Sequence, residues 1–298
     1  MKTTVIGLGL SCGCMALDLR RQNVTSHVIG VDSNQDHAAE ALKLGLVDEL
    51  KSLDGALKTS ELVIVAIPVS AITSLLPTLL DKIGPDTVVI DTGSTKAQVV
   101  RSVQSHPKRD QFVAAHPIAG TENSGPNAAF HGLFKNKTMI VCDREKSSVR
   151  ALEVADKIFA ALEVRVIDMN PVEHDKHVAY VSHLSHVSSF LLGQTVLDIE
   201  KDEKNIFALA GSGFASTVRL AKSSPDMLAP IFEQNLEYLS QALLEYIMHL
   251  QRFHYYLMKK DSKEVYRIMS QANEIRRVLD GIELKERNNK QKETVIEK

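Results

Sequence analysis

Short runs of β-branched and apolar residues alternate with longer helical patterns through the first half of the chain. The runs are nearly continuous in apolar character, which is typical of strands that helices cover on both faces. The segments between them are long enough for crossover helices. This pattern predicts an α/β domain with a doubly wound parallel sheet, whose strands we expect at residues 3–6, 26–31, 62–67, 87–90, 111–115, 138–141 and 164–167.

The second half of the chain has a different pattern. Residues 170–284 read as one helix after another, without β-like runs. One of these helices is expected to follow Ser224, because Pro225 suits a first helical position. The sequence thus predicts a sheet domain over residues 1–169 and an all-helical domain over 170–284. Residues 285–298 are charged and without periodicity, and we expect them to be disordered.

Apolar residues around positions 232–248 occupy more than one helical face. A helix that is apolar most of the way round needs cover on several sides, and a small helical domain supplies little of it. We therefore expect a homodimer built through the helical domain. A helix buried centrally within one subunit is the alternative.

Composition limits the partners. The 298 residues are 44% hydrophobic and 24% charged, with a formal net charge of -2. These values are ordinary for a globular protein and provide no positive surface for nucleic acid. Because no apolar run is long enough for a membrane span and no signal-peptide pattern precedes the first strand, we expect a cytoplasmic protein without a membrane partner. The three cysteines indicate no disulfide framework.

A glycine-rich segment joins the first predicted strand to a helical pattern. Its residues are Gly7, Leu8, Gly9 and Leu10, in the setting of a Rossmann-like dinucleotide fingerprint, and we expect all four to border the cofactor. The glycines permit a tight turn and a close approach of the backbone to a pyrophosphate, which the helix N-terminus attracts. The last fingerprint position holds Cys12, so we expect a slightly displaced helix. A remnant that no longer binds nucleotide is the alternative.

Asp32 lies at the predicted end of the second strand. An acidic side chain there hydrogen-bonds ribose hydroxyls and repels a 2′-phosphate, so the expected cofactor is NAD rather than NADP. A solvated turn aspartate is the alternative. Ile67 and Pro68 end a later strand at the same edge of the sheet, and we expect them to touch the cofactor.

Ser94 follows the strand predicted at 87–90, at the edge of the sheet where ligands of open α/β proteins bind. Thr95 and Gln98 fit a capping box for the next helix, which would leave the Ser94 hydroxyl available to a ligand. The alternative is that Ser94 itself caps this helix.

His116 precedes Pro117 after another predicted strand. Since a residue before proline is driven out of helical geometry, His116 should end its strand extended and point into the cleft. A neutral imidazole there can accept a proton from a substrate hydroxyl while hydride leaves the same carbon. A purely structural histidine is the alternative.

Together these segments resemble the prephenate dehydrogenase family over residues 2–282. Five segments carry the resemblance by their order and spacing: the fingerprint at Gly7, Asp-Thr-Gly-Ser-Thr-Lys at 91–96, His-Pro-Ile-Ala-Gly-Thr-Glu-Asn-Ser-Gly at 116–125, Ser-His-Leu-Ser-His at 182–186 and Gly-Ser-Gly-Phe-Ala-Ser-Thr-Val-Arg-Leu-Ala at 211–221. The resemblance implies NAD-dependent oxidative decarboxylation of prephenate to 4-hydroxyphenylpyruvate, a step of tyrosine biosynthesis. It also implies a homodimer interlocked through the helical domain.

The resemblance further implies roles for single residues. His116 would deprotonate the ring hydroxyl, and Ser94 would hydrogen-bond both that hydroxyl and His116. Arg219 would anchor a substrate carboxylate from an otherwise apolar stretch, where a permanent charge needs an anionic partner. A snorkelling surface arginine is the alternative. The same pocket would be lined by Thr121, Glu122, His183 and His186.

No metal is expected, although the start of the helical half is rich in histidine. On a regular helix His174 and His183 lie on opposite faces. One helix therefore cannot gather them as ligands of the same ion.

Other functions stay open. Arogenate is the rival substrate, because Glu122 can serve its ammonium group, while the uncharged Asn127 slightly favours prephenate. A β-hydroxyacid dehydrogenase would use a lysine of the helical domain, and Lys222 lacks a matching context. A catalytically silent NAD-binding regulator would account for Cys12.

Overall fold

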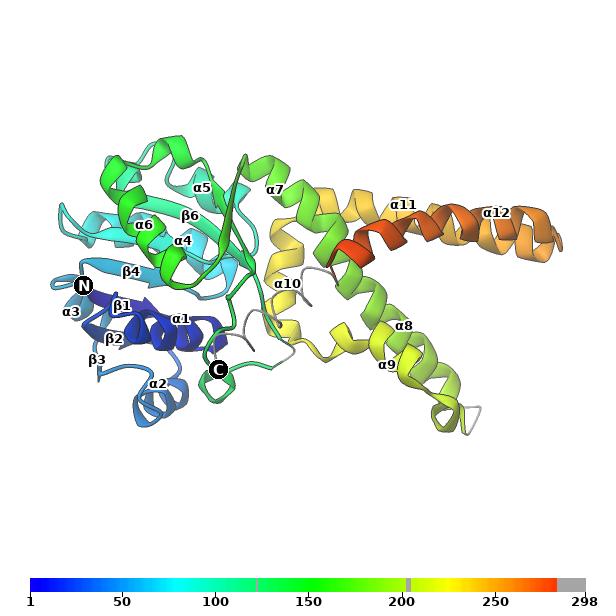
Figure 1. Cartoon of the computed structure of the whole chain (residues 1–298), viewed down its shortest axis with the longest axis horizontal. Helices are drawn as coiled ribbons and strands as arrows, with labels where there is room; N and C mark the ends of the chain where they lie inside the picture. Colours follow the sequence, from blue (N-terminus) through cyan, green and yellow to red (C-terminus); the bar gives the residue numbers. More distant parts are fainter. Residues whose placement is uncertain (122, 202–204, 283–298) are drawn as a thin grey trace, which may run out of the picture. The chain divides into compact units, whose positions relative to one another are not determined.

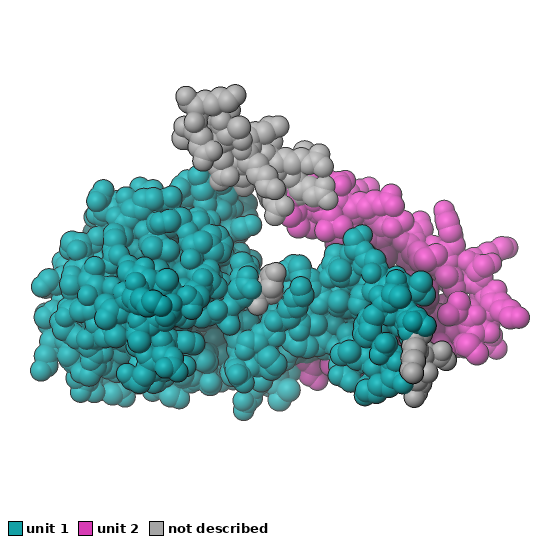
Figure 2. Space-filling model, turned by 90° about the horizontal axis from the view of Figure 1, so that it is seen from below, with its two compact units in different colours: residues 1–239 teal, residues 240–298 magenta. Residues whose placement is uncertain are grey.

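The computed structural model describes residues 1–121, 123–201 and 205–282 (Figure 1). The chain divides into two compact units, Met1–Leu239 and Ser240–Lys298 (Figure 2). Glu122 and the tail predicted at 285–298 lie outside the described residues. All the other residues predicted for the site belong to the first unit.

An eight-stranded sheet with the order β3-β2-β1-β4-β5-β6-β7-β8 forms the centre of the first unit (Figure 1). Each of the seven predicted runs is a strand, and only the two-residue β3 was not predicted. The strands are β1 (Lys2–Ile6), β2 (His27–Val31), β3 (Glu49–Leu50), β4 (Leu62–Val65), β5 (Val88–Asp91), β6 (Phe112–Ile118), β7 (Thr138–Cys142) and β8 (Arg165–Met169).

One strand pair departs from the predicted parallel arrangement. β6 and β7 are antiparallel, with His116 opposite Ile140, whereas the other pairs are parallel. The described part of the connection between them contains only the short turn η2 (Pro126–Ala128), and a parallel return normally needs a crossover helix. The prediction was wrong here because apolar periodicity does not encode strand direction.

Helices cover both faces of the sheet, as predicted. They are α1 (Leu10–Arg21), α2 (Gln35–Lys43), α3 (Leu53–Leu57), α4 (Val69–Lys82), α5 (Ala97–Ser102) and α6 (Val149–Ala161). Helices α1, α2 and α6 share a core with Val5 and Ile64. Helices α3, α4 and α5 share the opposite core with Ile6 and Val65. Successive strand residues thus enter opposite cores, which explains why the strands are continuously apolar.

The first unit continues through a series of helices. They are α7 (Pro171–Val178), the π turn η4 (Ala179–His183), α8 (Leu184–Glu200), η5 (Ile206–Leu209), α9 (Ser212–Thr217), η6 (Arg219–Lys222) and α10 (Pro225–Gln234). As predicted, α10 follows Ser224 and begins with Pro225. A small buried cluster of Val69, Leu228 and Ile231 holds α10 against α4.

The second unit contains most of α11 (Leu236–Met258), together with α12 (Ser262–Ala272) and η7 (Asn273–Ile275). The Asp261 carboxylate caps α12 by accepting a hydrogen bond from the amide of Glu264. Several large apolar side chains of α11 are more than half exposed, among them Leu244, Met248, Leu250, Leu257 and Met258. Within the described residues, no helix combines the length and the apolar character that crossing a bilayer would need.

Candidate active site

The loop between β1 and α1 has the geometry of a nucleotide turn. Gly7 has a φ of +91°, and a Cβ there would lie 2.4 Å from the carbonyl oxygen of Ala66, so only glycine fits. A Cβ at Gly9 would meet nothing within 4 Å, so the backbone there borders open space. No side chain caps the first turn of α1, and its amide groups can therefore receive an anion.

Cys12 and Gly13 share the role of the last fingerprint glycine. The Cys12 side chain is 1% exposed and its Sγ lies 3.9 Å from the carbonyl oxygen of Ile6, between α1 and β1. Burial raises the pKa of Cys12 to about 12, so it stays a neutral thiol. A Cβ at Gly13 would lie 2.7 Å from the Cβ of Ala129. The absence of a side chain at Gly13 therefore allows the segment that follows η2 to pack closely against α1. The expected displacement of α1 stays a prediction.

A groove of about 540 Å³ opens beside this loop. Five of the predicted cofactor residues line it: Gly7, Gly9, Asp32, Ile67 and Pro68. Leu8 and Leu10 do not line it, and the Leu8 side chain is buried in the core. Ala66, which belongs to the same predicted segment as Ile67 and Pro68, also lines the groove. Residues that were not predicted complete the lining: Ile6, Val31, Ser33, His37, Leu53, Ala71 and Leu75.

Asp32 connects this groove to the loop. One carboxylate oxygen, Oδ2, accepts the amide of Leu8 at 2.6 Å, and the other accepts the amide of Asn34 at 2.8 Å. Each oxygen can accept a further hydrogen bond. Asp32 is therefore a turn residue and a groove residue at once, and the open backbone at Gly9 together with this carboxylate fits a dinucleotide.

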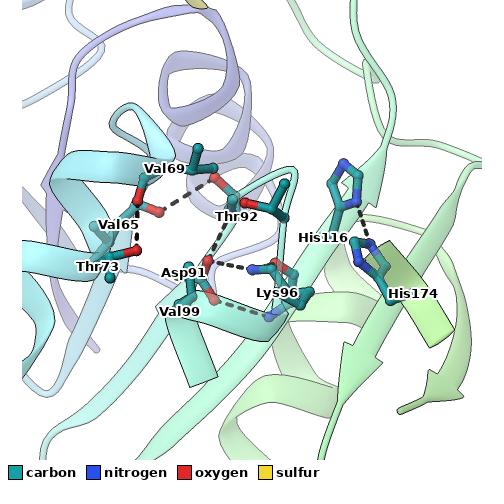
Figure 3. Close-up of polar contacts among 12 residues, drawn as sticks. Val65, Val69, Thr73, Asp91, Thr92, Lys96, Val99, His116 and His174 are labelled. Carbon is teal, nitrogen blue, oxygen red and sulfur yellow. Dashed lines mark hydrogen bonds and ion pairs between the residues drawn. The ribbon is translucent and has the colours of Figure 1, made fainter. Parts of the chain in front are cut away.

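His116 forms a hydrogen-bonded line with two neighbours that sequence reasoning did not assign to the site, His174 and Asp175. Figure 3 shows the first contact of this line, between His116 and His174. Nδ1 of His116 lies 2.8 Å from Nε2 of His174, and Nδ1 of His174 lies 2.7 Å from Oδ1 of Asp175. β6 continues to Ile118, so His116 lies within its strand and the prediction that it ends the strand was wrong. Nε2 of His116 has no hydrogen-bond partner among the residues that the structure describes.

Three histidines in this region are held in the neutral form. Burial lowers the pKa of His116 well below its ordinary value, and the charge of Lys96 acts in the same direction, as would protonation of His174 or His183. Burial also lowers the pKa of His174, against the opposing effect of Asp175. Burial lowers the pKa of His183 to about 4. At neutral pH each of these rings is therefore uncharged and keeps one nitrogen with a lone pair.

A buried ion pair positions the strand that carries His116 (Figure 3). Lys96 and Asp91 have no exposed surface, and the Lys96 ammonium contacts Asp91 Oδ2 and donates to the Ala115 carbonyl at 2.7 Å. Asp91 Oδ1 accepts the Ala115 amide at 3.3 Å. Both charges thus hold the residue just before His116. The signal that could have identified them is two opposite charges within the short segment 91–96, at the end of an apolar strand.

The surroundings of Ser94 differ from the prediction. The capping box was wrong, because Thr95 donates to the side chain of Gln234 at 2.7 Å and Gln98 donates to its carbonyl at 3.0 Å. Asp175 accepts the amides at the start of α5 instead. The Ser94 hydroxyl makes no hydrogen bond within the described part of the chain, so the implied bond to His116 is not formed, and its catalytic role stays a prediction.

The helical residues of the predicted site are only partly brought together. His183 is buried, and its Nδ1 lies 3.1 Å from the side-chain amide of Asn235, which also donates to the Asp175 carbonyl at 2.7 Å. His186 is half-buried and donates through Nδ1 to Ser182. Arg219 lies in η6 with an exposed side chain. The half-buried hydroxyl of Thr121 accepts the Asn123 amide. The substrate-binding roles of these residues stay predictions.

The π turn η4 changes the relation between His174 and His183. It follows a wider i to i+5 pattern and so alters the helical phase between the two residues. Both rings influence the pKa of His116. The expectation that His174 and His183 lie on opposite helical faces stays a prediction. In the described residues no group of three His, Cys, Asp or Glu side chains is arranged to hold a metal ion.

Comparisons with known proteins agree with this geometry. Residues 15–168 match the nucleotide-binding domain of prephenate dehydrogenase, and residues 170–271 match its dimerization domain. The chain is 31% identical over 297 residues to prephenate dehydrogenase of Bacillus subtilis (strain 168), which covers 96% of this chain and 78% of that protein.

Solved structures are similar over nearly the whole chain. Prephenate dehydrogenase from Aquifex aeolicus in complex with hydroxyphenyl propionate and NAD+ has a TM-score of 0.85 and 27% identity, covering 94% of this chain and 98% of that one. Synechocystis arogenate dehydrogenase has a TM-score of 0.73 and 29% identity, covering 93% and 99%. The resemblance seen in the sequence is confirmed, and the chain belongs to the prephenate dehydrogenase family.

Proposed function

We propose that the protein catalyses the NAD-dependent oxidative decarboxylation of prephenate to 4-hydroxyphenylpyruvate. Family membership supports the reaction class. The observation that carries the proposal in this chain is the neutral His116, whose Nε2 is not engaged by any described residue. His116 lies two residues beyond Ala114, which is level with the last residues of β5, β4 and β1, so the ring lies at the same edge of the sheet as the groove at Gly7 and Asp32.

The protein itself has two tasks in this reaction: it positions the substrate and it transfers one proton. Bound NAD would accept the hydride that leaves the hydroxyl-bearing ring carbon. His116 Nε2 accepts the hydroxyl proton as the carbonyl forms. The carboxylate on the opposite ring carbon leaves as carbon dioxide, its bonding electrons make the ring aromatic, and His116 returns the proton to the phenolate oxygen. Aromatisation drives the reaction forward, so correct placement of the substrate is the main requirement.

We assign the substrate contacts to residues around this ring. Arg219 anchors a carboxylate, which a planar guanidinium can meet with two hydrogen bonds. Ser94 hydrogen-bonds the ring hydroxyl. Further contacts are assigned to Thr121, Glu122, His183 and His186. The likeness to an arogenate dehydrogenase supports arogenate as the second candidate substrate.

The groove favours NAD over NADP. The Asp32 carboxylate would repel a 2′-phosphate and accept hydrogen bonds from ribose hydroxyls. Among the described residues that line the groove there is no lysine or arginine to bind such a phosphate. Because neither Leu8 nor Leu10 lines the groove, we assign them a contact with the cofactor only through their backbone.

We infer a homodimer through a helical domain at residues 170–284, next to a nucleotide-binding domain at 1–169. The match to a dimerization domain supports this assembly. The exposed apolar side chains of α11, such as Leu244 and Leu250, support it too, because a second copy would remove them from water. Sedimentation of the purified protein tests it, with a monomer as the contrary result.

The reaction is tested by mixing the purified protein with NAD or NADP and with prephenate or arogenate, while NADH or NADPH formation is followed by absorbance. We expect the fastest turnover with NAD and prephenate. Faster turnover with arogenate would establish the second candidate. Absence of turnover with either substrate, from protein that binds NAD, would replace both with the catalytically silent regulator.

A further inference from the structure

Asp175, His174 and His116 form a continuous hydrogen-bonded line from α7 to β6. His174 has no exposed surface and Asp175 is 2% exposed, so water does not replace either partner. The residues come from two elements that are far apart in the sequence. Their contacts therefore depend on the tertiary fold and not on a local motif.

The Asp175 end sets the direction of every hydrogen in the line. Its carboxylate accepts the backbone amides of Lys96 at 2.7 Å and Ala97 at 2.9 Å. Backbone amides only donate, and an ionised carboxylate only accepts. Asp175 therefore accepts from His174 as well, and His174 carries its hydrogen on Nδ1.

The same reasoning then fixes the next ring. A neutral imidazole has one N–H group, so Nε2 of His174 is an acceptor. Nδ1 of His116 must donate to it across 2.8 Å. Nε2 of His116 is left with a free lone pair, and this is the nitrogen that the proposed reaction uses.

We propose that His174, oriented by Asp175, is a positioning residue that holds His116 in the Nδ1–H tautomer and so makes Nε2 of His116 the proton acceptor. The inference rests on the proposed function, because it assigns the tautomer that proton acceptance needs. Without His174 either nitrogen of His116 can carry the hydrogen. In a fraction of the enzyme molecules, His116 would then present its Nε2–H group to the substrate hydroxyl and could not accept the hydroxyl proton.

Two variants separate this role from a purely structural one. His174→Leu removes the acceptor, whereas His174→Gln can present its Oε1 near the place of Nε2 and still accept from His116. For His174→Leu we expect kcat with prephenate to fall roughly 10²-fold, within the range for proton-transfer catalysis and tautomer control. The KM for NAD should stay unchanged, and His174→Gln should recover most of the loss. Equal kcat in folded His174→Leu and wild type would overturn the proposal.

The tautomer can be observed without any substrate. In protein labelled with ¹⁵N-histidine, two-bond ¹⁵N–¹H spectra distinguish Nδ1–H from Nε2–H, and the His116 signals are identified by their loss in His116→Asn. We expect Nδ1–H for His116 in wild type and His174→Gln, and a mixture in His174→Leu. Nε2–H in the wild type would overturn the proposal even if His174→Leu does not fold. An inactive protein with His116 as Nδ1–H would contradict the proposed function and leave the positioning contact intact.

Discussion

The side-chain amide of Asn235 donates a hydrogen bond to Nδ1 of His183, 3.1 Å away. The same nitrogen of Asn235 donates to the Asp175 carbonyl at 2.7 Å, which fixes the orientation of the amide. Because His183 accepts at Nδ1, its neutral ring carries hydrogen on Nε2. The fold thus contains one histidine, His116, with a nitrogen free to accept a proton, and another, His183, that can donate a hydrogen bond.

Replacing this amide with a carboxylate should change the charge of His183. In Asn235→Asp the adjacent negative charge favours the imidazolium, so we expect the His183 pKa to rise from about 4 by at least one unit. An NMR titration of the His183 ring measures it. Asn235→Ala is the matched variant without the charge and should not produce this rise. The same pKa in Asn235→Asp and wild type would show that the amide does not face the ring.

His116→Asn tests the proton acceptor. The Asn amide can keep the hydrogen bond to His174 but has no equivalent of Nε2, so we expect kcat to fall by a factor of about 10² to 10⁴. NAD affinity should stay within twofold in a direct binding titration. His27→Asn, at the start of β2 beside Glu49, is the control and should keep full activity. A fully active His116→Asn would remove His116 from the mechanism.

Asp32→Asn should weaken NAD binding and reduce the preference over NADP. The amide oxygen can still accept the Leu8 amide, so the loop is kept while the charge is lost. Loss of a charged hydrogen bond corresponds to about 1.5–3 kcal/mol, or roughly 10- to 100-fold in Kd. Calorimetric titration with both cofactors measures the change, and Asp36→Asn at the exposed start of α2 is the control. Unchanged affinity and selectivity would count against Asp32 as the ribose contact.

Alanine substitutions at the two fingerprint glycines should affect different properties: Gly7→Ala should lower stability, and Gly9→Ala should weaken NAD binding. In Gly7→Ala the positive φ and the contact with the Ala66 carbonyl strain the backbone, so thermal unfolding should occur at a lower temperature, at a cost of about 1–3 kcal/mol or more. In Gly9→Ala the new methyl group meets no protein atom, so stability should match wild type. NAD should still bind roughly tenfold more weakly there, about 1.4 kcal/mol, because the methyl group occupies the path of the pyrophosphate. Wild-type NAD affinity in Gly9→Ala would place the cofactor elsewhere.

Stability should decrease in mild acid because of the buried neutral histidines. The folded-state pKa of His183 is about 4, below its ordinary 6.5, with Asp175, His186 and His174 as its charged or titratable neighbours. Below pH 6.5 the unfolded chain therefore binds protons that the folded chain refuses, so the free energy of unfolding falls as pH falls. Each such group contributes at most about 1.4 kcal/mol per pH unit. Urea unfolding at a series of pH values between 7.5 and 5 measures how steeply the free energy of unfolding falls with pH. We expect this slope to be shallower in His183→Gln than in wild type. An identical slope in both proteins would contradict the lowered pKa of His183.

Much of the fold was predictable because strands that are buried on both faces of a sheet appear in the sequence as continuous apolar runs. The strands at 62–67 and 87–90 were recognised from continuous apolar runs, and β4 and β5 lie there. The direction of β7 was not predictable, since the same apolar run serves a parallel or an antiparallel neighbour. The two-residue strand at Glu49 was too short to leave a pattern.

The site was predictable where it depends on the ends of strands. Gly7, Asp32 and His116 follow or end apolar runs, and topology alone brings such positions to one edge. His174 and Asp175 could not be found this way, because their partners in β6 and at the start of α5 lie more than fifty residues away in the sequence. The capping box failed for a related reason, since a tertiary contact competed successfully with the local pattern.

β7 and β8 run opposite to the other strands of the sheet, and this direction limits how the length of the segment between β8 and His174 can vary. Cys142 pairs with Ala114 on one side and with Met169 on the other. The last residue of β8 is therefore level with the middle of β6, and α7 begins two residues later. His174 then meets His116 after a single helical turn. One inserted or deleted residue between Met169 and His174 would rotate that ring by about 100° and separate the two histidines. Relatives that keep this pair should therefore differ in length elsewhere and keep this short segment constant.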